Sequence, residues 1–304
     1  MTRPLILITV LFLFCWSFPP QSFASTPDAN AIAQTLQVGD KNIYKGEAKL
    51  IDIYHPDFTS AKLSWQGKTI SYTFQGEASP RWQALLSLSL QSKAQTAPLK
   101  ITYSNGKTTR TVSMTFDVLE KSYPVQKLSV APKYASPPAS VLEKIKKDQA
   151  EIRQAFGTIS SKQYWSLPLL RPVEGVTTSE YGLRREFNGQ KRNPHRGLDL
   201  DGNLGETISA VEAGKVILVA EHYYGGKTVV IDHGLGVVSA YLHMNTFAVT
   251  QGEIVTRGQH IGTVGKTGRV TGPHLHLSIS VLGQSINPNL LLAPRKANVA
   301  SRAF

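Results

Sequence analysis

The chain has 304 residues, with 33 lysines and arginines against 21 acidic residues and a single cysteine. This length favours two domains of ordinary size over one. Hydrophobic residues make up 41% and aromatic residues 9% of the chain, which excludes a wholly disordered protein. A charged fraction of only 18%, together with 24 glycines, indicates strands and turns more than long surface helices. We therefore expect a mainly β protein.

The first 24 residues have the pattern of a secretory signal peptide. Arg3 is the only charge before Asp28, and the short apolar run over residues 5–14 is followed by Ser22-Phe23-Ala24, a small-x-small cleavage pattern. The run is too short to span a bilayer comfortably. We expect cleavage after residue 24, export to the periplasm or cell envelope, and no stable membrane span afterwards. The alternative is an uncleaved N-terminal anchor.

The only cysteine, Cys15, lies within this apolar run, and Phe14 is not the small residue that lipid attachment requires before a cysteine. The mature chain thus lacks cysteine, which excludes disulfides, thiolate zinc sites and cysteine nucleophiles. The net charge of +12 either favours contact with anionic envelope polymers and lipid head groups or only maintains solubility. No nucleic-acid motif accompanies the charge, so we expect no nucleic-acid partner.

Short alternating strands dominate residues 25–125, which we expect to form a small N-terminal β-sandwich domain. Apolar residues alternate with polar ones through residues 86–90, 99–103 and 112–118. The last two runs flank Asn105-Gly106, a pair typical of β-hairpins. No catalytic constellation is apparent in this half, where His55 is expected to be structural or solvated.

A proline-rich linker and a helix are expected over residues 126–165. Three prolines within residues 131–138 predict an extended segment. Ser140 and Glu143 match a capping box, and Gly157 is suited to end the helix. An apolar stripe at helical spacing is formed by Leu142, Ile145, Ile152 and Phe156. We expect this helix to pack between the two domains.

The composition changes again over residues 166–293. Valine-rich runs at 214–220, 228–232 and 237–243 are separated by turns that contain glycine. This pattern predicts a C-terminal antiparallel β-sheet domain with almost no helix. A short basic tail, residues 294–304, follows it.

The histidines are concentrated in this second half: the chain has eight, and all but His55 lie between His195 and His276. His195 and Asp199 are four residues apart, and His274 and His276 are two apart, so each pair shares one face of an extended strand. Two such strands would present imidazoles and a carboxylate to one point. That arrangement describes a catalytic zinc site with three protein ligands and one open position. The spacing alone leaves open which of the two C-terminal histidines is a ligand.

Together these motifs resemble those of the lysostaphin-type (LytM-like) zinc metallopeptidases, which cut peptide cross-links of bacterial peptidoglycan. The resemblance covers residues 170–292 and implies a LytM-type peptidase domain. The matching runs are residues 182–185, 188–189, 194–199, 241–243, 258–262 and 272–276, with His260 standing where the family usually has an aliphatic residue. Residues 30–160 more loosely resemble the β-domain and proline-linked helix that precede the peptidase in some exported members.

The resemblance implies that His195, Asp199 and His276 hold one Zn²⁺, with His243 and His274 facing the water that the metal activates. No His-Glu-x-x-His motif is present, so these two histidines are the acid–base candidates, and their roles remain undivided.

Tyr241 precedes His243 by two residues, on the same face of a regular strand. It is either a hydrogen-bond donor to the developing oxyanion or a packed core residue. The family often has an acidic or aromatic residue shortly after its second metal motif, whereas this chain has Leu277-Ser278-Ile279. We expect that departure to alter substrate fit and not the metal.

The function implied by the resemblance is an exported zinc endopeptidase acting on peptidoglycan stem peptides. Both D-alanyl–diaminopimelate cross-links and glycine bridges remain open as the bond that is cut. One alternative is a non-catalytic LytM-like regulator of other cell-wall hydrolases. Another is an exported zinc peptidase that acts on protein.

Overall fold

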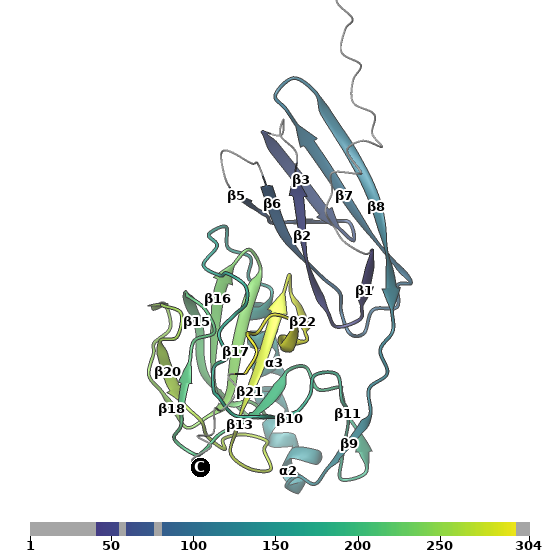
Figure 1. Ribbon diagram of the computed structural model, residues 1–304. Coiled ribbons are helices and arrows are strands. Elements are labelled where there is room, and N and C mark those ends of the chain that lie inside the picture. Colours follow the sequence, from purple (N-terminus) through teal and green to yellow (C-terminus); the bar gives the residue numbers. More distant parts are fainter. Residues whose placement is uncertain (1–40, 55–58, 76–80, 296–304) are drawn as a thin grey trace, which may run out of the picture.

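The computed structural model describes residues 41–54, 59–75 and 81–295 (Figure 1). The predicted signal peptide, His55 and nearly all of the predicted basic tail lie outside these residues. In the described part of the chain, none of the helices has the length and apolar content that a membrane crossing requires. The structure is mainly β, as the composition predicts.

Two sheets face each other in the N-terminal half, with strand orders β1-β8-β7-β3-β4 and β2-β6-β5 (Figure 1). Both contribute to one apolar core that includes Trp65, Trp82 and Phe116. The predicted hairpin is confirmed, because Ser104 pairs with Thr109 across the turn. The strands are β1 (Asn42–Tyr44), β2 (Ala48–Tyr54), β3 (Ser60–Trp65), β4 (Lys68–Ile70), β5 (Thr73–Gln75), β6 (Arg81–Ser87), β7 (Thr96–Ser104) and β8 (Thr109–Leu119).

The connecting segment is less extended than the prolines suggest. β9 (Val125–Leu128) pairs in parallel with β11 (Arg184–Phe187) and so joins the C-terminal half. A short helix, α2 (Pro132–Ala135), then interrupts the segment, because proline suits the first turn of a helix. The expectation of a wholly extended linker over residues 131–138 is therefore wrong. The domain limits stay a prediction.

The long helix α3 (Leu142–Phe156) begins later than its predicted cap. A 3₁₀ turn, η1 (Ala139–Val141), takes up Ser140, and no side chain caps the first turn of α3. The predicted capping box is therefore wrong, whereas Gly157 does end the helix. The C-terminal part of the apolar stripe of α3, Ile152 and Phe156, packs against Val230, Val238 and Ala240 of the C-terminal sheet, whereas Leu142 is exposed.

The C-terminal half is built on a large sheet of order β10-β13-β21-β17-β16-β15-β19, with β22 beside β21. The neighbours β13, β21, β17, β16 and β15 pair antiparallel, as predicted. Smaller sheets have the orders β12-β11-β9 and β14-β20-β18. The elements after β11 are β12 (Gln190–Lys191), β13 (Leu198–Asp201), β14 (Thr207–Ser209), β15 (Gly214–His222), β16 (Gly226–Gly234), β17 (Val237–Met244), β18 (Thr246–Phe247), β19 (Ile254–Val255), β20 (His260–Thr263), β21 (His274–Val281), β22 (Gln284–Ile286) and η2 (Pro288–Leu290); β10 (Thr177–Ser179) precedes β11.

The two faces of the large sheet differ in chemistry. On β21, Leu275, Leu277 and Ile279 point into the main core and are fully buried. The alternate residues, from His274 to Ser280, point to the opposite face. α3 covers part of that face, where Ser280 Oγ lies 3.4 Å from the Phe156 carbonyl. The histidine-bearing end of β21 therefore lies beside the helix.

A packed interface joins the two halves. Ser87 Oγ, on β6, donates a hydrogen bond of 2.8 Å to the Val281 carbonyl at the end of β21. Leu85, two residues earlier on β6, packs into the apolar core of the C-terminal half. The Asn287 amide donates to the Gly46 carbonyl over 2.8 Å. The β-sandwich is thus fixed against the same sheet that carries the histidines.

Candidate metal centre

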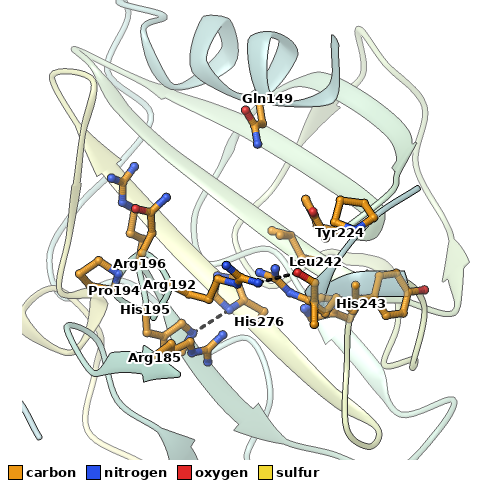
Figure 2. Close-up of a pocket in the computed structure, with 16 residues that line it drawn as sticks. Gln149, Arg185, Arg192, Pro194, His195, Arg196, Tyr224, Leu242, His243 and His276 are labelled. Carbon is orange, nitrogen blue, oxygen red and sulfur yellow. Dashed lines mark hydrogen bonds between the residues drawn. The ribbon is translucent and has the colours of Figure 1, made fainter. Parts of the chain in front are cut away.

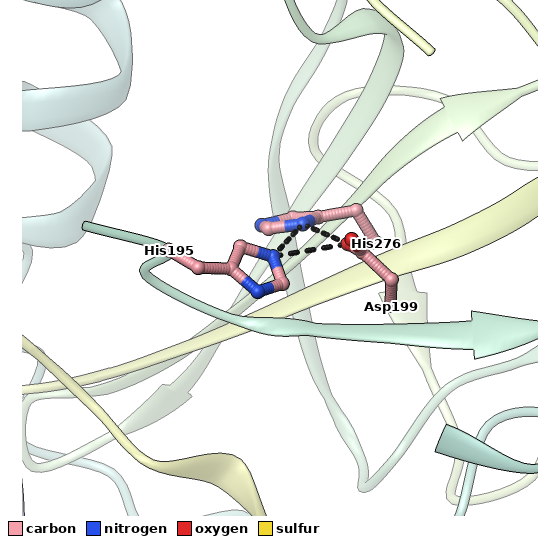
Figure 3. Close-up of side chains that lie close together, drawn as sticks. All are labelled: His195, Asp199 and His276. Atoms are coloured by element: carbon pink, nitrogen blue, oxygen red, sulfur yellow. Dashed lines mark hydrogen bonds and ion pairs between the residues drawn. The ribbon is translucent and has the colours of Figure 1, made fainter. Parts of the chain in front are cut away.

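His195, Asp199 and His276 converge on one point (Figure 3). Asp199 on β13 and His276 on β21 are direct cross-strand partners, and His195 lies in the loop that enters β13. His276 Nδ1 is 2.7 Å from Asp199 Oδ1, His195 Nε2 is 3.0 Å from the same oxygen, and the two nitrogens are 3.0 Å apart. The predicted trio is therefore brought together, and each residue offers one atom to a common centre.

Neighbouring groups determine which ring nitrogens carry protons. His195 Nδ1 donates to the Glu180 carbonyl over 2.8 Å, which leaves its Nε2 as an acceptor. Ser278 Oγ donates to the Arg196 carbonyl and so accepts from His276 Nε2, which leaves Nδ1 as an acceptor. The two nitrogens that face each other across 3.0 Å thus have no proton to share. Lone pairs this close to a carboxylate oxygen fit a bound cation, and two nitrogens with one oxygen are donors that zinc accepts.

Arg185 completes the surroundings of Asp199. Its Nη2 is 2.7 Å from Asp199 Oδ2, which leaves Oδ1 directed at the two imidazoles. The carboxyl group is therefore ionised at neutral pH, as a metal ligand must be.

His243 and His274 lie beside this trio. Their ring centroids are 4.9 Å apart, and the His243 ring is 5.9 Å from the ring of His276. His243 Nδ1 donates to the Thr267 carbonyl and His274 Nδ1 to the Gly272 carbonyl, each over 2.9 Å. Both Nε2 atoms are consequently left as acceptors. His274 Nε2 is 3.7 Å from Asp199 Oδ1, so this accepting atom lies close to the metal-binding trio.

Burial keeps two of these histidines, His243 and His276, neutral. It lowers the pKa of His276 to about 4, although the Asp199 carboxylate opposes the shift. Burial and the nearby rings of His274 and His276 likewise hold the pKa of His243 well below its ordinary value. Neutral imidazoles can bind a metal ion or accept a proton at pH 7.

Of the two roles considered for Tyr241, its position favours the packed core residue over the donor to the oxyanion. Its side chain is fully buried in the main core, and its hydroxyl accepts a hydrogen bond of 2.8 Å from the Val211 amide. His243 does not share its direction, because the chain adopts a φ of +65° at His243. One additional residue is also accommodated in β17 here, since Val229 pairs with Tyr241 but Lys227 pairs with Met244. This bulge turns His243 toward the other histidines.

Gly197, just before β13, allows this part of the chain to lie close to His276 on β21. A Cβ atom at this position would lie 2.6 Å from His276 Nε2 and would also collide with the Leu277 carbonyl. Residue 197 must therefore lack a side chain for β13 and β21 to keep this separation.

The centre opens into a cavity of about 450 Å³, whose lining includes His195, His243 and His276 (Figure 2). Gln149 of α3 and Tyr224 contribute to its walls. Arginine side chains gather around it, and Arg185, Arg192 and Arg196 are drawn beside the histidines in Figure 2. A peptide can therefore reach the histidines from solvent.

A second group of potential ligands, Asp148, Glu151 and His222, has a structural explanation. Asp148 accepts hydrogen bonds from the Tyr223 amide and from Lys144, and His222 Nε2 lies 3.2 Å from Glu151. These contacts attach α3 to the β15–β16 hairpin. The sequence predicts exposed side chains at His222 and His260 and a structural role for His233. His222 is instead buried, whereas His260 is exposed and His233 is buried.

Two residues that hold the proposed metal ligands in place, Ser278 and Arg185, were not identified in this role from the sequence. Ser278 orients His276, although the departure at residues 277–279 was expected to affect substrate fit alone. Arg185 was part of a family motif without a role, and here it holds Asp199. Neither contact follows from spacing, because each depends on which strands become neighbours.

Comparisons with known proteins agree with this geometry. Residues 193–288 match the model of Peptidase family M23. The peptidoglycan DD-endopeptidase ShyA of Vibrio cholerae is 38% identical over 126 residues, which cover 41% of this chain and 29% of that protein. The murein hydrolase activator NlpD of Escherichia coli is 32% identical over 125 residues, covering 41% of this chain and 31% of that protein. The chain thus spans less than a third of the length of these two relatives.

The similarity to one solved structure covers more of the chain than these two sequence matches do. This structure, from Pseudomonas aeruginosa and described as a candidate M23 peptidase, is 26% identical, covers 86% of this chain and 97% of its own, and superposes with a TM-score of 0.63. The similarity therefore includes the N-terminal β-strands as well as the large sheet. Residues 193–288, with the histidines and Asp199 that they bring together, thus match peptidase family M23, the LytM-type peptidases, and the fold is shared with a structure described as one of them.

Proposed function

We propose that this chain is an exported, zinc-dependent endopeptidase that hydrolyses peptide cross-links of bacterial peptidoglycan. The observation that carries the proposal is the group of three converging ligand atoms, with two further imidazoles whose accepting nitrogens lie beside them. The name of ShyA, a peptidoglycan DD-endopeptidase, supports the substrate class. The pattern of residues 1–24 supports export.

In this proposal His195 Nε2, Asp199 Oδ1 and His276 Nδ1 hold the ion. When bound, zinc supplies a Lewis acid that polarises the scissile carbonyl and lowers the pKa of a water molecule. Arg185 and Ser278 keep two of the ligands in the orientation that binding needs, through Asp199 Oδ2 and His276 Nε2 respectively. These contacts leave the donor atoms ready for a metal ion.

His243 and His274 are the proton-transfer groups of the proposal. Their Nδ1 protons are held by backbone carbonyls, so each Nε2 is available to take a proton from the attacking water. The same nitrogen, once protonated, can return the proton to the departing amine. Both rings are fixed by main-chain atoms, which keeps the transfer distance short and reproducible.

A non-catalytic regulator is the second candidate, because NlpD, a murein hydrolase activator, is among the relatives. The presence of all five proposed metal-binding and proton-transfer residues favours the enzyme. A regulator would need neither the ion nor the paired imidazoles, so its activity would survive their replacement.

Mass spectrometry of muropeptides released from purified sacculi separates the candidates. The proposal predicts that the full chain with zinc releases uncross-linked peptides, that a chelator stops the release, and that zinc restores it. His195→Ala is expected to release none, with His260→Ala, an exposed position, as the matched control. Release that persists in His195→Ala would contradict the proposal. Cleavage of protein but not of muropeptides would instead favour a peptidase with a protein substrate.

A further inference from the structure

The cavity above the centre is unusually one-sided in charge. Its lining includes the guanidinium groups of Arg185, Arg192, Arg196 and Arg269. No aspartate or glutamate is among the described residues that line it. A ligand that enters this cavity therefore meets positive charge that the lining itself does not neutralise.

Three of the four arginines already have partners in the chain. Arg185 is paired with Asp199, Arg192 donates to the Ala135 carbonyl, and Arg196 donates to Gln91 Oε1 over 2.8 Å. Arg269 differs from them, because among the described residues no side chain or carbonyl accepts a hydrogen bond from its guanidinium. Its guanidinium donors therefore remain available to a ligand.

Two aromatic rings fix the Arg269 guanidinium. Its central carbon lies 4.6 Å from the ring centroid of Phe187 and 4.4 Å from that of Tyr224. Stacking of this kind holds the plane of a guanidinium while leaving its N–H edge free to donate. Burial, with the like charges of Arg185 and Arg192, lowers the pKa of Arg269 to about 10, so the group still carries its charge at neutral pH.

The loop that bears Arg269 also orients the proton-transfer histidines. The carbonyl of Thr267, two residues earlier, accepts from His243 Nδ1, and the carbonyl of Gly272 accepts from His274 Nδ1. The Arg269 amide donates to the Tyr224 carbonyl over 2.9 Å, which ties the loop to the β15–β16 turn. The stacked cation is therefore held by the same short segment that positions both rings.

We propose that Arg269 binds a free carboxylate of the substrate close to the scissile bond, and so selects carboxylate-bearing cross-links. This inference rests on the proposed function and specifies its substrate. In a D-alanyl–diaminopimelate cross-link, the carbon bonded to the scissile nitrogen also carries a free carboxylate. A glycine bridge has no carboxylate there. A guanidinium edge matches a carboxylate with two parallel hydrogen bonds, which a neutral amide cannot accept in the same way.

The test compares two cross-linked muropeptides that differ only in this group, one with the free diaminopimelate carboxylate and one with the carboxamide. For the full chain with zinc, kcat/KM for the carboxylate form is expected to be about 10- to 100-fold higher, the range of a charge-assisted hydrogen bond. Arg269→Gln is expected to bring the ratio close to one. Arg184→Gln is the matched control, because it removes one positive charge from an exposed side chain outside the cavity.

Equal rates of wild-type cleavage, or a ratio that Arg269→Gln leaves unchanged, would overturn the inference and leave the proposed function standing. If neither peptide is cleaved, the proposed function fails, and calorimetric binding of the two peptides to the same protein decides the anion site: a carboxylate preference supports it and equal binding overturns it. If Arg269→Gln does not fold, Arg269→Lys keeps the charge and is expected to reduce the wild-type preference without abolishing it.

Discussion

His276 and Ser278 project from the same face of β21, and the imidazole Nε2 donates to the serine Oγ over 2.9 Å. The hydroxyl hydrogen is used in turn on the Arg196 carbonyl, 3.0 Å away. A single serine therefore determines that His276 presents an unprotonated Nδ1 to Asp199. The metal centre depends on this contact although Ser278 never touches the ion in the proposed arrangement.

Replacing that serine tests the proton arrangement. In Ser278→Ala the His276 Nε2–H loses its acceptor, so the ring is no longer held in one tautomer and orientation. We expect the zinc affinity, measured by competition with a fluorescent chelator, to fall about 10- to 100-fold. Ser280→Ala, on the same face of β21 and beside α3, is expected to bind zinc like the wild type. Equal affinities in the two variants would show that the hydroxyl has no part in the centre.

Replacing a proton-transfer histidine should reduce turnover without removing the metal ion. His243→Ala removes an accepting nitrogen but none of the three proposed ligands, so zinc content is expected to stay at one per chain while kcat falls about 10²- to 10⁴-fold. His195→Ala is the comparison, with loss of both zinc and activity. Metal analysis together with a muropeptide assay makes the distinction. Loss of zinc in His243→Ala would instead place that ring among the ligands.

Gly197 should be intolerant of a methyl group. Gly197→Ala puts a Cβ atom against the Leu277 carbonyl and the His276 ring, so β13 and β21 must move apart. We expect the free energy of unfolding to fall by about 1–3 kcal/mol, with a parallel loss of zinc affinity. Gly272→Ala is the control, since nothing lies within 4 Å of its added Cβ, and a change of about 0.5 kcal/mol or less is expected. Urea unfolding of both variants provides the comparison.

The buried His233 predicts a pH dependence of stability. Its Nδ1 donates to the Ala213 carbonyl over 2.7 Å, and burial lowers its pKa. Between that lowered pKa and the unfolded value of about 6.5, the unfolded chain binds a proton that the folded chain does not. The free energy of unfolding should therefore decrease as the pH falls below about 6.5. In His233→Gln this decrease should be smaller than in wild type or in His260→Gln; identical slopes in all three proteins would contradict the assignment.

Regular periodicity predicts the strands and the two metal-ligand motifs, whereas the choice of His276 over His274 as the ligand came from the resemblance to the LytM-like peptidases. His195 with Asp199, and His274 with His276, are close in sequence, and an antiparallel pair of strands brings the two motifs together in register. The oxyanion role considered for Tyr241 assumed that the period of two continues to His243, whereas a bulge and the φ of +65° at His243 change the direction of the histidine side chain. Regular spacing cannot reveal where a strand departs from regularity.

Other misses concern contacts between distant segments. His222 is buried by α3. Its partner in that helix, Glu151, lies 71 residues earlier in the chain. The partners of Arg185 and Ser278 are similarly set by strand order and not by local pattern. At α3 the predicted cap failed because a 3₁₀ turn absorbed Ser140, a local competition that the Ser-x-x-Glu pattern does not resolve.

Zinc K-edge X-ray absorption spectroscopy of the purified full chain would identify the ligands of the metal. We expect one zinc per chain, with two imidazole nitrogens and carboxylate oxygen at about 2.0–2.2 Å. This signature should disappear in His195→Ala and His276→Ala but persist in His274→Ala. A zinc shell that is unchanged when His195 or His276 is replaced would show that these residues do not hold the ion.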